Sequence, residues 1–270
     1  MKIAITGKGG VGKTFIAGAL ACNLHKKGFN VLAIDADPNA NLAYTLGLDE
    51  TKANQIIPIS DNAELIKEKT GADPDSYGAV FRLSFTVDDI VERYAVETPL
   101  GVNLLVMGVV RKASTGCMCP ANYLLRMLLR HVLVRRDEAV VADMEAGTEH
   151  LGRGTAEHVD AMLIVVEPSV KAFETANRIK KLAAQMNIKN VLLVGNKIMN
   201  KKDKNAVQIT AKKLGTSLLG LIHFDPAIRE ADLSGVSPLL SSPRTEAVQE
   251  AAALCDRLLE VDTEADSGGF

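Results

Sequence analysis

Close to its amino terminus the chain carries a glycine-rich segment, Gly7-Lys8-Gly9-Gly10-Val11-Gly12-Lys13-Thr14. The segment follows the short apolar run Ile3 to Ile5 and leads into an amphipathic stretch from Thr14 to Lys27. It matches the pattern G-x-x-x-x-G-K-S/T in full, and this pattern binds phosphate when a strand precedes it and a helix follows it. We therefore expect a strand, a loop and a helix, with the N–H groups of the loop converging on phosphate oxygens.

Apolar runs and amphipathic stretches alternate along the rest of the chain. The apolar runs lie at Val31 to Ile34, Leu104 to Met107, Ala139 to Ala142, Leu163 to Val166, Val191 to Val194 and Leu218 to Ile222. The later amphipathic stretches lie at Ala121 to Val134, Ala172 to Met186 and Ala206 to Leu214. Short, wholly apolar runs are typical of strands buried on both faces, and strands that alternate with helices form parallel sheets. We predict an α/β fold with a mostly parallel sheet and helices on both faces.

Length limits how this fold is organised. The chain has 270 residues, which at about 150 residues per domain is one large domain or two small ones. Residues 49–101 break the alternation, because proline and glycine separate short mixed segments there, and we expect an insertion at the edge of the sheet. We predict a single phosphate-binding domain over residues 1–261 and a disordered polar tail over residues 262–270.

Charge and hydropathy narrow the functional classes. The 31 Lys and Arg residues against 33 Asp and Glu residues give a net charge of −2, which excludes a generally basic coat for nucleic acid. We find no secretory signal, and no apolar run approaches the length of about 18 residues that a membrane span needs. The 4 cysteines are too few for a disulfide framework. We expect a cytoplasmic protein, in which close cysteine pairs bind metal or carry redox chemistry.

Two classes of nucleotide site compete for the glycine-rich loop. Its glycines also fit the dinucleotide pattern G-x-G-x-x-G, with Asp35 near the position of a ribose-binding acid. A dinucleotide site gains nothing from the Lys13-Thr14 pair, whereas a triphosphate site uses both residues. Lys13 would reach the β- and γ-phosphates, and the Thr14 hydroxyl would bind Mg²⁺. We therefore predict a nucleoside triphosphate with Mg²⁺, held by residues 7–14.

Lys8 is the earlier of two lysines in the loop and completes the pattern K-G-G-x-G-K-T. This pattern resembles the deviant Walker family of ATPases, which includes MinD, ParA and the nitrogenase iron protein. The resemblance implies ATP or ADP as the nucleotide. It also implies that Lys8 crosses a homodimer interface to the phosphates of the opposite subunit, so that ATP hydrolysis depends on dimerisation. The alternative is a solvated loop lysine.

Asp35 and Asp37 follow the second predicted strand, at the edge where parallel sheets bind their ligands. The resemblance implies that Asp37 orients the attacking water and accepts its proton, while Asp35 supports the metal shell. Phosphoryl transfer depends mostly on positioning, so modest basicity suffices. Lys8, Lys13 and Asp37 are thus the predicted catalytic residues. The alternative for both aspartates is a helix cap before Asn41.

A second acidic segment, Asp143-Met144-Glu145-Ala146-Gly147, follows the strand at Ala139 to Ala142. An apolar strand that ends in an acid is the expected form of a Walker B segment, so Asp143 should hold Mg²⁺ through water. Gly147 would let its backbone N–H approach the γ-phosphate, which makes this loop a second switch between the ATP and ADP states. We assign no role to Glu145.

Two further loops follow later strands. Asn196-Lys197 ends one strand, and Phe224-Asp225-Pro226 follows the last one. These positions resemble the base-recognition loops of the family, with the Asn196 amide facing the adenine edge. The alternative for Asn196 is ordinary turn chemistry, since asparagine is common after strands.

A Cys-x-Cys pair lies in Gly116-Cys117-Met118-Cys119-Pro120. Two thiols this close can bind one soft metal ion from one side, but a closed site needs two more ligands. Cys22 and Cys255 lie inside predicted helices, where cysteine is usually a buried small apolar residue. A two-fold dimer would bring Cys117 and Cys119 from both subunits together and form a four-thiolate site for one soft metal ion. The alternative is a coincidental thiol pair in a loop.

The Cys-x-Cys loop, the segment Val106-Met107-Gly108 before it and the stretch from Asp143 to Gly154 resemble one group within the family. This group is the CooC-type ATPases, which assist nickel insertion into carbon monoxide dehydrogenase. The resemblance implies that Cys117 and Cys119 of both subunits bind Ni²⁺, and a thiolate site of this kind would also accept Zn²⁺ in vitro. A sibling group with similar motifs serves acetyl-CoA synthase. The nitrogenase iron protein instead holds its cluster by widely separated cysteines, one of them in the second switch. Ala146 stands at that position here, which disfavours such a cluster.

We therefore predict an ATP-hydrolysing nickel metallochaperone that dimerises with ATP and serves carbon monoxide dehydrogenase or acetyl-CoA synthase. The alternative is a positional switch of the MinD or ParA kind that binds membrane or DNA. From Glu246 onward the chain carries seven acids and one base, Arg257, which an anionic membrane would repel. Lys197, Lys201, Lys202 and Lys204 form a basic cluster in one predicted loop, which we interpret as a solvated edge. We expect neither membrane nor nucleic acid as a partner.

Overall fold

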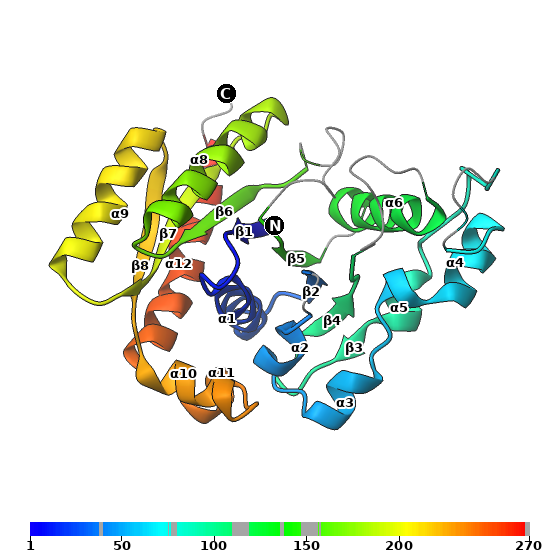
Figure 1. Ribbon diagram of the computed structural model, residues 1–270, viewed down its shortest axis with the longest axis horizontal. Helices are drawn as coiled ribbons and strands as arrows, with labels where there is room; N and C mark the ends of the chain where they lie inside the picture. The colour runs from blue at the N-terminus through cyan, green and yellow to red at the C-terminus, as the bar shows by residue number, and fades with distance from the viewer. Residues whose placement is uncertain are drawn as a thin grey trace.

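The computed structural model describes residues 1–37, 40–74, 76, 80–109, 119–135, 138–146, 156 and 158–267. Its strands are β1 (Lys2–Gly7), β2 (Val31–Ala36), β3 (Val96–Glu97), β4 (Asn103–Val106), β5 (Ala139–Met144), β6 (Ala161–Val166), β7 (Val191–Ile198) and β8 (Ser217–His223). Within these residues they form an eight-stranded sheet in the order β3-β4-β2-β5-β1-β6-β7-β8 (Figure 1). Every pair is parallel except β3 with β4. The predicted α/β sheet is confirmed.

Helices cover both faces of the sheet. One layer holds α1 (Lys13–Lys26) and α12 (Glu246–Ser267), and the other holds α6 (Pro120–Arg135), α8 (Val170–Gln185) and α9 (Lys201–Leu214) (Figure 1). The shorter α2 (Leu42–Thr45), α10 (Pro226–Leu233) and α11 (Pro238–Ser241) lie near the carboxyl-terminal ends of the parallel strands. Because both faces are covered, β1, β2, β5 and β6 are buried at every position. This explains why their sequences show no polar alternation.

Local signals fix the ends of the helices. The Asn200 side chain accepts hydrogen bonds from the N–H groups of Lys202 and Asp203 and so begins α9, while Gly215 ends it in the left-handed conformation at φ 60°. Helix α9 therefore begins five residues before the predicted start at Ala206, because its first residues are all polar and show no apolar periodicity. The lysines at 201, 202 and 204, predicted to lie in a loop, lie on that first turn.

Residues 49–101 form the predicted insertion at the sheet edge. They contain α3 (Glu50–Gln55), a 3₁₀ turn (Ile59–Asp61), α4 (Ala63–Thr70), α5 (Ile90–Tyr94) and the edge strand β3. Two ion pairs join α4 to α5 and the residue before it. Lys69 Nζ lies 2.6 Å from Asp89 Oδ1, and Arg93 Nη1 lies 3.0 Å from Glu68 Oε1. Strand β3 was not predicted, because two residues show no periodicity.

The carboxyl-terminal helix is longer than the sequence predicts. We expected helical spacing up to Glu260 and a disordered tail from residue 262, whereas α12 continues to Ser267. Residues 268–270 lie outside the described part of the chain, and the domain boundary stays a prediction. Among the described helices, none combines the length and the apolar character that crossing a membrane requires.

Candidate functional site

The ends of β1, β2 and β5 bring the predicted site residues together. Asp35 on β2 is the register partner of Asp143 on β5, and Ile5 on β1 pairs with Asp143 from the other side. The loops that follow these three neighbouring strands therefore start side by side. They border a cavity of about 1560 Å³, whose lining includes Gly9, Lys13 and Thr14.

The phosphate loop is open toward this cavity. Gly12 adopts φ 92° at the start of α1, and as a glycine it has no side chain to cap the first N–H groups of that helix. Among the described residues, a Cβ atom at Gly9 or Gly10 would meet nothing within 4 Å, which indicates free space beside the loop. Uncapped N–H groups at a helix start, facing a cavity, are suited to binding an anion. The strand, loop and helix expected from the sequence are present, and phosphate binding by the loop stays a prediction.

Lys13 lies against the first acidic loop. Its side chain is 5% exposed, and its Nζ lies 3.6 Å from Asp37 Oδ2. Both residues line the cavity. A phosphate group bound at the loop would compete with Asp37 for the Lys13 ammonium. Asp37 therefore has a charge partner that a nucleotide can displace.

Thr14 and Asp143 form a candidate Mg²⁺ site. The Thr14 hydroxyl donates a 2.6 Å hydrogen bond to Asp143 Oδ2, while Asp143 Oδ1 is buried and has no hydrogen-bond partner among the described residues. Burial raises the pKa of Asp143 to about 6, even though the Thr14 hydrogen bond and the positive charge of Lys13 lower it. A buried carboxylate oxygen without a partner beside a hydroxyl suits a hard cation that prefers oxygen ligands. These residues fit Mg²⁺.

Asp35 is fully buried behind the first acidic loop. Its Oδ1 accepts the N–H of Asp37 at 3.2 Å, and its Oδ2 accepts the N–H of Leu42, the first residue of α2, at 2.9 Å. Burial raises the pKa of Asp35 to about 7, and the neighbouring Asp143 charge adds to the increase. The contact with Leu42 is the cap-like arrangement that the sequence left open. Asp35 thus holds the loop that carries Asp37.

Lys8 is paired within its own chain. Its Nζ lies 3.7 Å from Glu167 Oε1, just after β6, and Glu167 Oε2 lies 3.8 Å from the Nζ of Lys197. Lys197 Nζ also donates a 2.6 Å hydrogen bond to the Gly10 carbonyl. Glu167 therefore joins two lysines over the phosphate loop. Glu167 is not among the predicted site residues, although an acid directly after an apolar strand is a signal for one.

The Asn196 side chain is hydrogen-bonded to the phosphate loop. Its Nδ2 donates to the Val11 carbonyl at 2.8 Å, and its Oδ1 accepts the N–H of Lys197 at 2.9 Å. A Cβ atom on Gly12 would collide with this Nδ2, so the loop needs glycine there. The predicted contact of the amide with an adenine stays a prediction, for which the second Nδ2 hydrogen is the remaining donor.

The loop after β8 borders the same cavity. Phe224 is 40% exposed, and Phe224 and Asp225 both line the cavity together with Asn196. Asp225 caps α10 by accepting the N–H of Ala227, with Pro226 in the first turn. The two loops predicted to recognise the base therefore meet at one cavity, although Asp225 also has a structural role.

The predicted metal loop is described only in part. Cys117 and Gly147 lie outside the described residues. Cys119 is buried and stands directly before α6. Cys22 and Cys255 are buried within α1 and α12, as the sequence predicted.

Comparisons with known proteins agree with this architecture. The family model for the CobQ/CobB/MinD/ParA nucleotide binding domain matches residues 2–239. The carbon monoxide dehydrogenase accessory protein CooC of Rhodospirillum rubrum is 45% identical over 96% of this chain and 97% of its own length. An uncharacterized ATP-binding protein of Methanocaldococcus jannaschii is 43% identical over 93% of this chain and 95% of its own. MinD in the MinC:MinD cell division complex of Aquifex aeolicus superimposes with a TM-score of 0.69 at 23% identity, covering 96% of both chains.

Proposed function

The chain belongs to the CobQ/CobB/MinD/ParA family of nucleotide-binding ATPases, and on that premise we propose that it is a nickel metallochaperone driven by ATP. The observation that carries the proposal is the combination of a complete phosphate loop with the Cys117-Met118-Cys119 pair in one chain. The similarity to CooC over nearly the full length of both proteins supports it. The client would be a nickel enzyme, either carbon monoxide dehydrogenase or the related acetyl-CoA synthase.

In this proposal the phosphate loop binds ATP through its N–H groups, and Lys13 contacts the β- and γ-phosphates. Mg²⁺, held through Thr14 and Asp143, would offset phosphate charge. The phosphate charge would draw Lys13 Nζ away from Asp37 Oδ2, which lies 3.6 Å from it. Asp37, then released, orients the attacking water and accepts its proton. Asp35 keeps the loop of Asp37 in position, and the Gly147 N–H contacts the γ-phosphate.

The proposal requires a homodimer in the ATP state. Lys8 is 36% exposed at the surface of the loop, so its ammonium can leave Glu167 and reach the phosphates of a partner subunit. A two-fold axis that brings the two Lys8 side chains to opposite nucleotides also brings two Cys-x-Cys loops into one assembly. Cys117 and Cys119 of both subunits would then bind one Ni²⁺ as cargo, and hydrolysis would release it to the client.

Metal analysis tests the cargo assignment. We expect one Ni²⁺ per dimer in the protein loaded with a non-hydrolysable ATP analogue, and loss of tight nickel binding in Cys117→Ser with Cys119→Ser. The matched control is Cys255→Ser, which removes one thiol from α12 and should keep the nickel. Nickel-dependent activation of carbon monoxide dehydrogenase by the loaded dimer is the second measurement. Unchanged tight nickel binding in the double variant would contradict the proposal.

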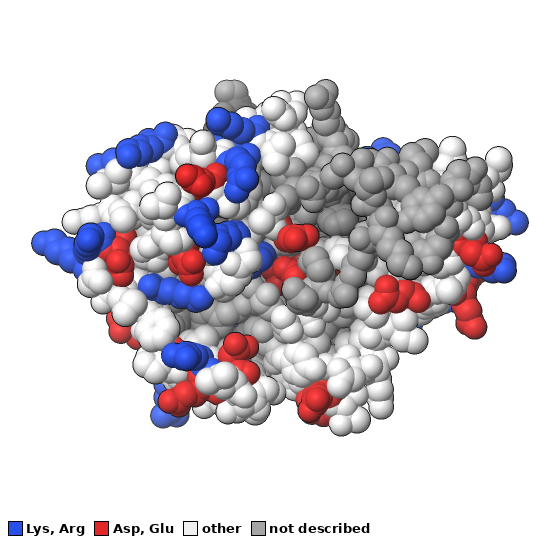
Figure 2. Space-filling view, viewed as in Figure 1, with Lys and Arg blue, Asp and Glu red and all other residues white. Residues whose placement is uncertain are grey.

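A second candidate is a positional switch that binds DNA or membrane. Figure 2 shows Lys and Arg gathered over α8 and α9, and Lys201, Lys202 and Lys204 are exposed on the first turn of α9. Against membrane binding, the carboxyl-terminal segment is acidic. ATP-dependent co-sedimentation with DNA or with anionic vesicles would favour this candidate. No co-sedimentation with either would contradict it.

A further inference from the structure

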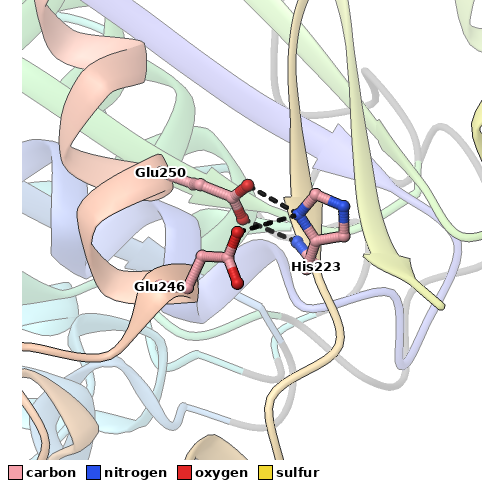
Figure 3. Close-up of side chains that lie close together, drawn as sticks. All are labelled: His223, Glu246 and Glu250. Atoms are coloured by element: carbon pink, nitrogen blue, oxygen red, sulfur yellow. Dashed lines mark hydrogen bonds and ion pairs between the residues drawn. The ribbon is translucent and has the colours of Figure 1, made fainter. Parts of the chain in front are cut away.

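A second group of metal-ligating side chains lies where the end of β8 meets the start of α12 (Figure 3). His223 is the last residue of β8, and Glu246 and Glu250 lie on the first turns of α12. Their spacing of four residues puts both carboxylates on one face of the helix, and Figure 3 shows both directed toward the imidazole. One imidazole and two carboxylates therefore converge from two elements of the fold.

The distances are compatible with one bound ion. His223 Nδ1 lies 2.6 Å from Glu250 Oε1 and 3.9 Å from Glu246 Oε1, and the three ligand atoms lie within 4.8 Å of one another. Metal–ligand bonds of about 2.1 Å separate neighbouring ligand atoms by about 3.0–3.4 Å in octahedral or tetrahedral sites. These two distances lie on either side of that range, so small side-chain rotations bring all three atoms onto one ion. The ion replaces the proton of the 2.6 Å hydrogen bond between His223 Nδ1 and Glu250 Oε1, and that proton is released to solvent.

The backbone of His223 orients the Glu250 carboxylate. The His223 N–H donates a 2.7 Å hydrogen bond to Glu250 Oε2, which turns the other oxygen of that carboxylate toward the imidazole. The Glu250 side chain is 24% exposed, whereas that of Glu246 is 75% exposed. Glu250 is therefore a fixed ligand, and Glu246 is one that can swing onto an ion or away from it.

We propose that His223, Glu246 and Glu250 bind one divalent first-row transition ion, such as Ni²⁺, Co²⁺ or Zn²⁺, at the rim of the nucleotide cavity. An imidazole nitrogen selects these ions over Mg²⁺ and Ca²⁺, which prefer oxygen ligands alone. Three protein ligands leave coordination positions open for water or for a donor from another protein.

The site is independent of the proposed thiol site. Its ligands lie on the edge strand β8 and on α12, whereas Cys119 stands before α6 at the other half of the sheet. It also has a direct connection to the nucleotide cavity, because His223 lines that cavity and precedes Phe224 and Asp225, which line it too. A bound ion would tie the end of β8 to α12 and restrict the loop next to it.

Cobalt binding by the full chain tests the proposal. The parent carries Cys117→Ser and Cys119→Ser, so the proposed thiol site cannot contribute, and Co²⁺ alone is the probe. We expect one Co²⁺ per chain by calorimetry, with weak visible bands of nitrogen and oxygen ligation, and displacement by Zn²⁺ but not by excess Mg²⁺. Adding His223→Ala or Glu246→Gln should weaken binding by about tenfold or more.

The matched control is Glu230→Gln on α10, which changes the charge as Glu246→Gln does but removes no ligand. We expect its Co²⁺ affinity to equal that of the parent. Equal affinity in the His223→Ala variant would overturn the proposal, as would equal weakening by Glu230→Gln, which would indicate general electrostatic attraction. Because Glu246 is mostly exposed, its substitution reports on binding without threatening the fold.

Discussion

The Nζ of Lys8 lies 3.7 Å from Oε1 of Glu167 in the same chain. The residue that is proposed to act on a partner subunit is thus held by its own subunit. Glu167 also lies 3.8 Å from Lys197, which contacts the Gly10 carbonyl. In the proposed dimer, Lys8 would have to leave an ion pair beside the phosphate loop, and that pair would oppose the assembly.

Removal of this carboxylate should favour the dimer. In Glu167→Gln, Lys8 loses its charge partner in both subunits of the dimer. An exposed ion pair of about 0.2–1 kcal/mol per subunit then corresponds to a dimer about 2 to 30 times tighter. Analytical ultracentrifugation with a non-hydrolysable ATP analogue measures the change. Glu174→Gln, an exposed carboxylate on α8, is the control of equal charge. A weaker dimer in Glu167→Gln would show that Glu167 supports assembly instead.

Loss of Lys8 itself should separate binding from hydrolysis. We expect Lys8→Ala to retain nucleotide binding, because Lys13 and the loop N–H groups remain, but to lose most ATP hydrolysis, because Lys8 acts in the transition state of the partner. Nucleotide titration and steady-state hydrolysis are the two measurements. Parent hydrolysis that stays proportional to enzyme concentration in a demonstrably monomeric range would contradict this dependence.

The buried carboxylates should make the free protein less stable as pH rises. Asp35 and Asp143 have folded-state pKa values raised to about 7 and about 6, above the unfolded value of about 3.9. The folded state therefore binds more protons, so their contribution to stability is complete below about pH 4 and is lost as pH rises to about 7.

The variant Asp143→Asn isolates this effect from the other carboxylates of the protein. In buffer without Mg²⁺, the melting temperature of the natural protein should fall relative to that of Asp143→Asn between pH 4 and pH 7. Addition of Mg²⁺ with ADP should reverse the trend for the natural protein only. Parallel pH profiles of the two proteins would rule out the proposed burial cost.

The phosphate loop should not tolerate a side chain at Gly12. In Gly12→Ala, the new Cβ collides with the Asn196 amide, and the alanine backbone must adopt φ 92°. Together these effects should cost about 1–3 kcal/mol of folding free energy. Asn196→Ala alone loses the buried hydrogen bond to the Val11 carbonyl, but Gly12→Ala should cost less in the Asn196→Ala background than in the natural protein, because the collision is gone. Gly9→Ala is the stability control, because a Cβ there meets nothing within 4 Å among the described residues. Denaturant unfolding of the three single variants and the double variant measures these differences.

The central fold was predictable because its strands are wholly apolar and its loop motif fixes a strand before it and a helix after it. The edge strand β3 was not, because two residues carry no pattern. Within the site, Lys13, Thr14, Asp35, Asp37 and Asp143 were found because each follows a predicted strand or lies in a motif. The contacts of Glu167 and Asn196 with the loop could not be predicted, because Glu167 follows β6 and Asn196 lies on β7, far along the chain from the loop. The group of His223, Glu246 and Glu250 likewise depends on tertiary packing.

Strand β1 lies inside the sheet, between β5 and β6. Its amides are hydrogen-bonded to a neighbour on each side and buried under two helical layers, so they should exchange with deuterium only when the whole domain unfolds. The edge strands β3 and β8 should open more often. The phosphate loop is therefore attached to an internal strand, whose exchange should require unfolding of the domain, whereas His223 lies on an edge strand, whose amides should exchange after local opening. Ion binding at His223 should slow the exchange of β8 and leave that of β1 unchanged.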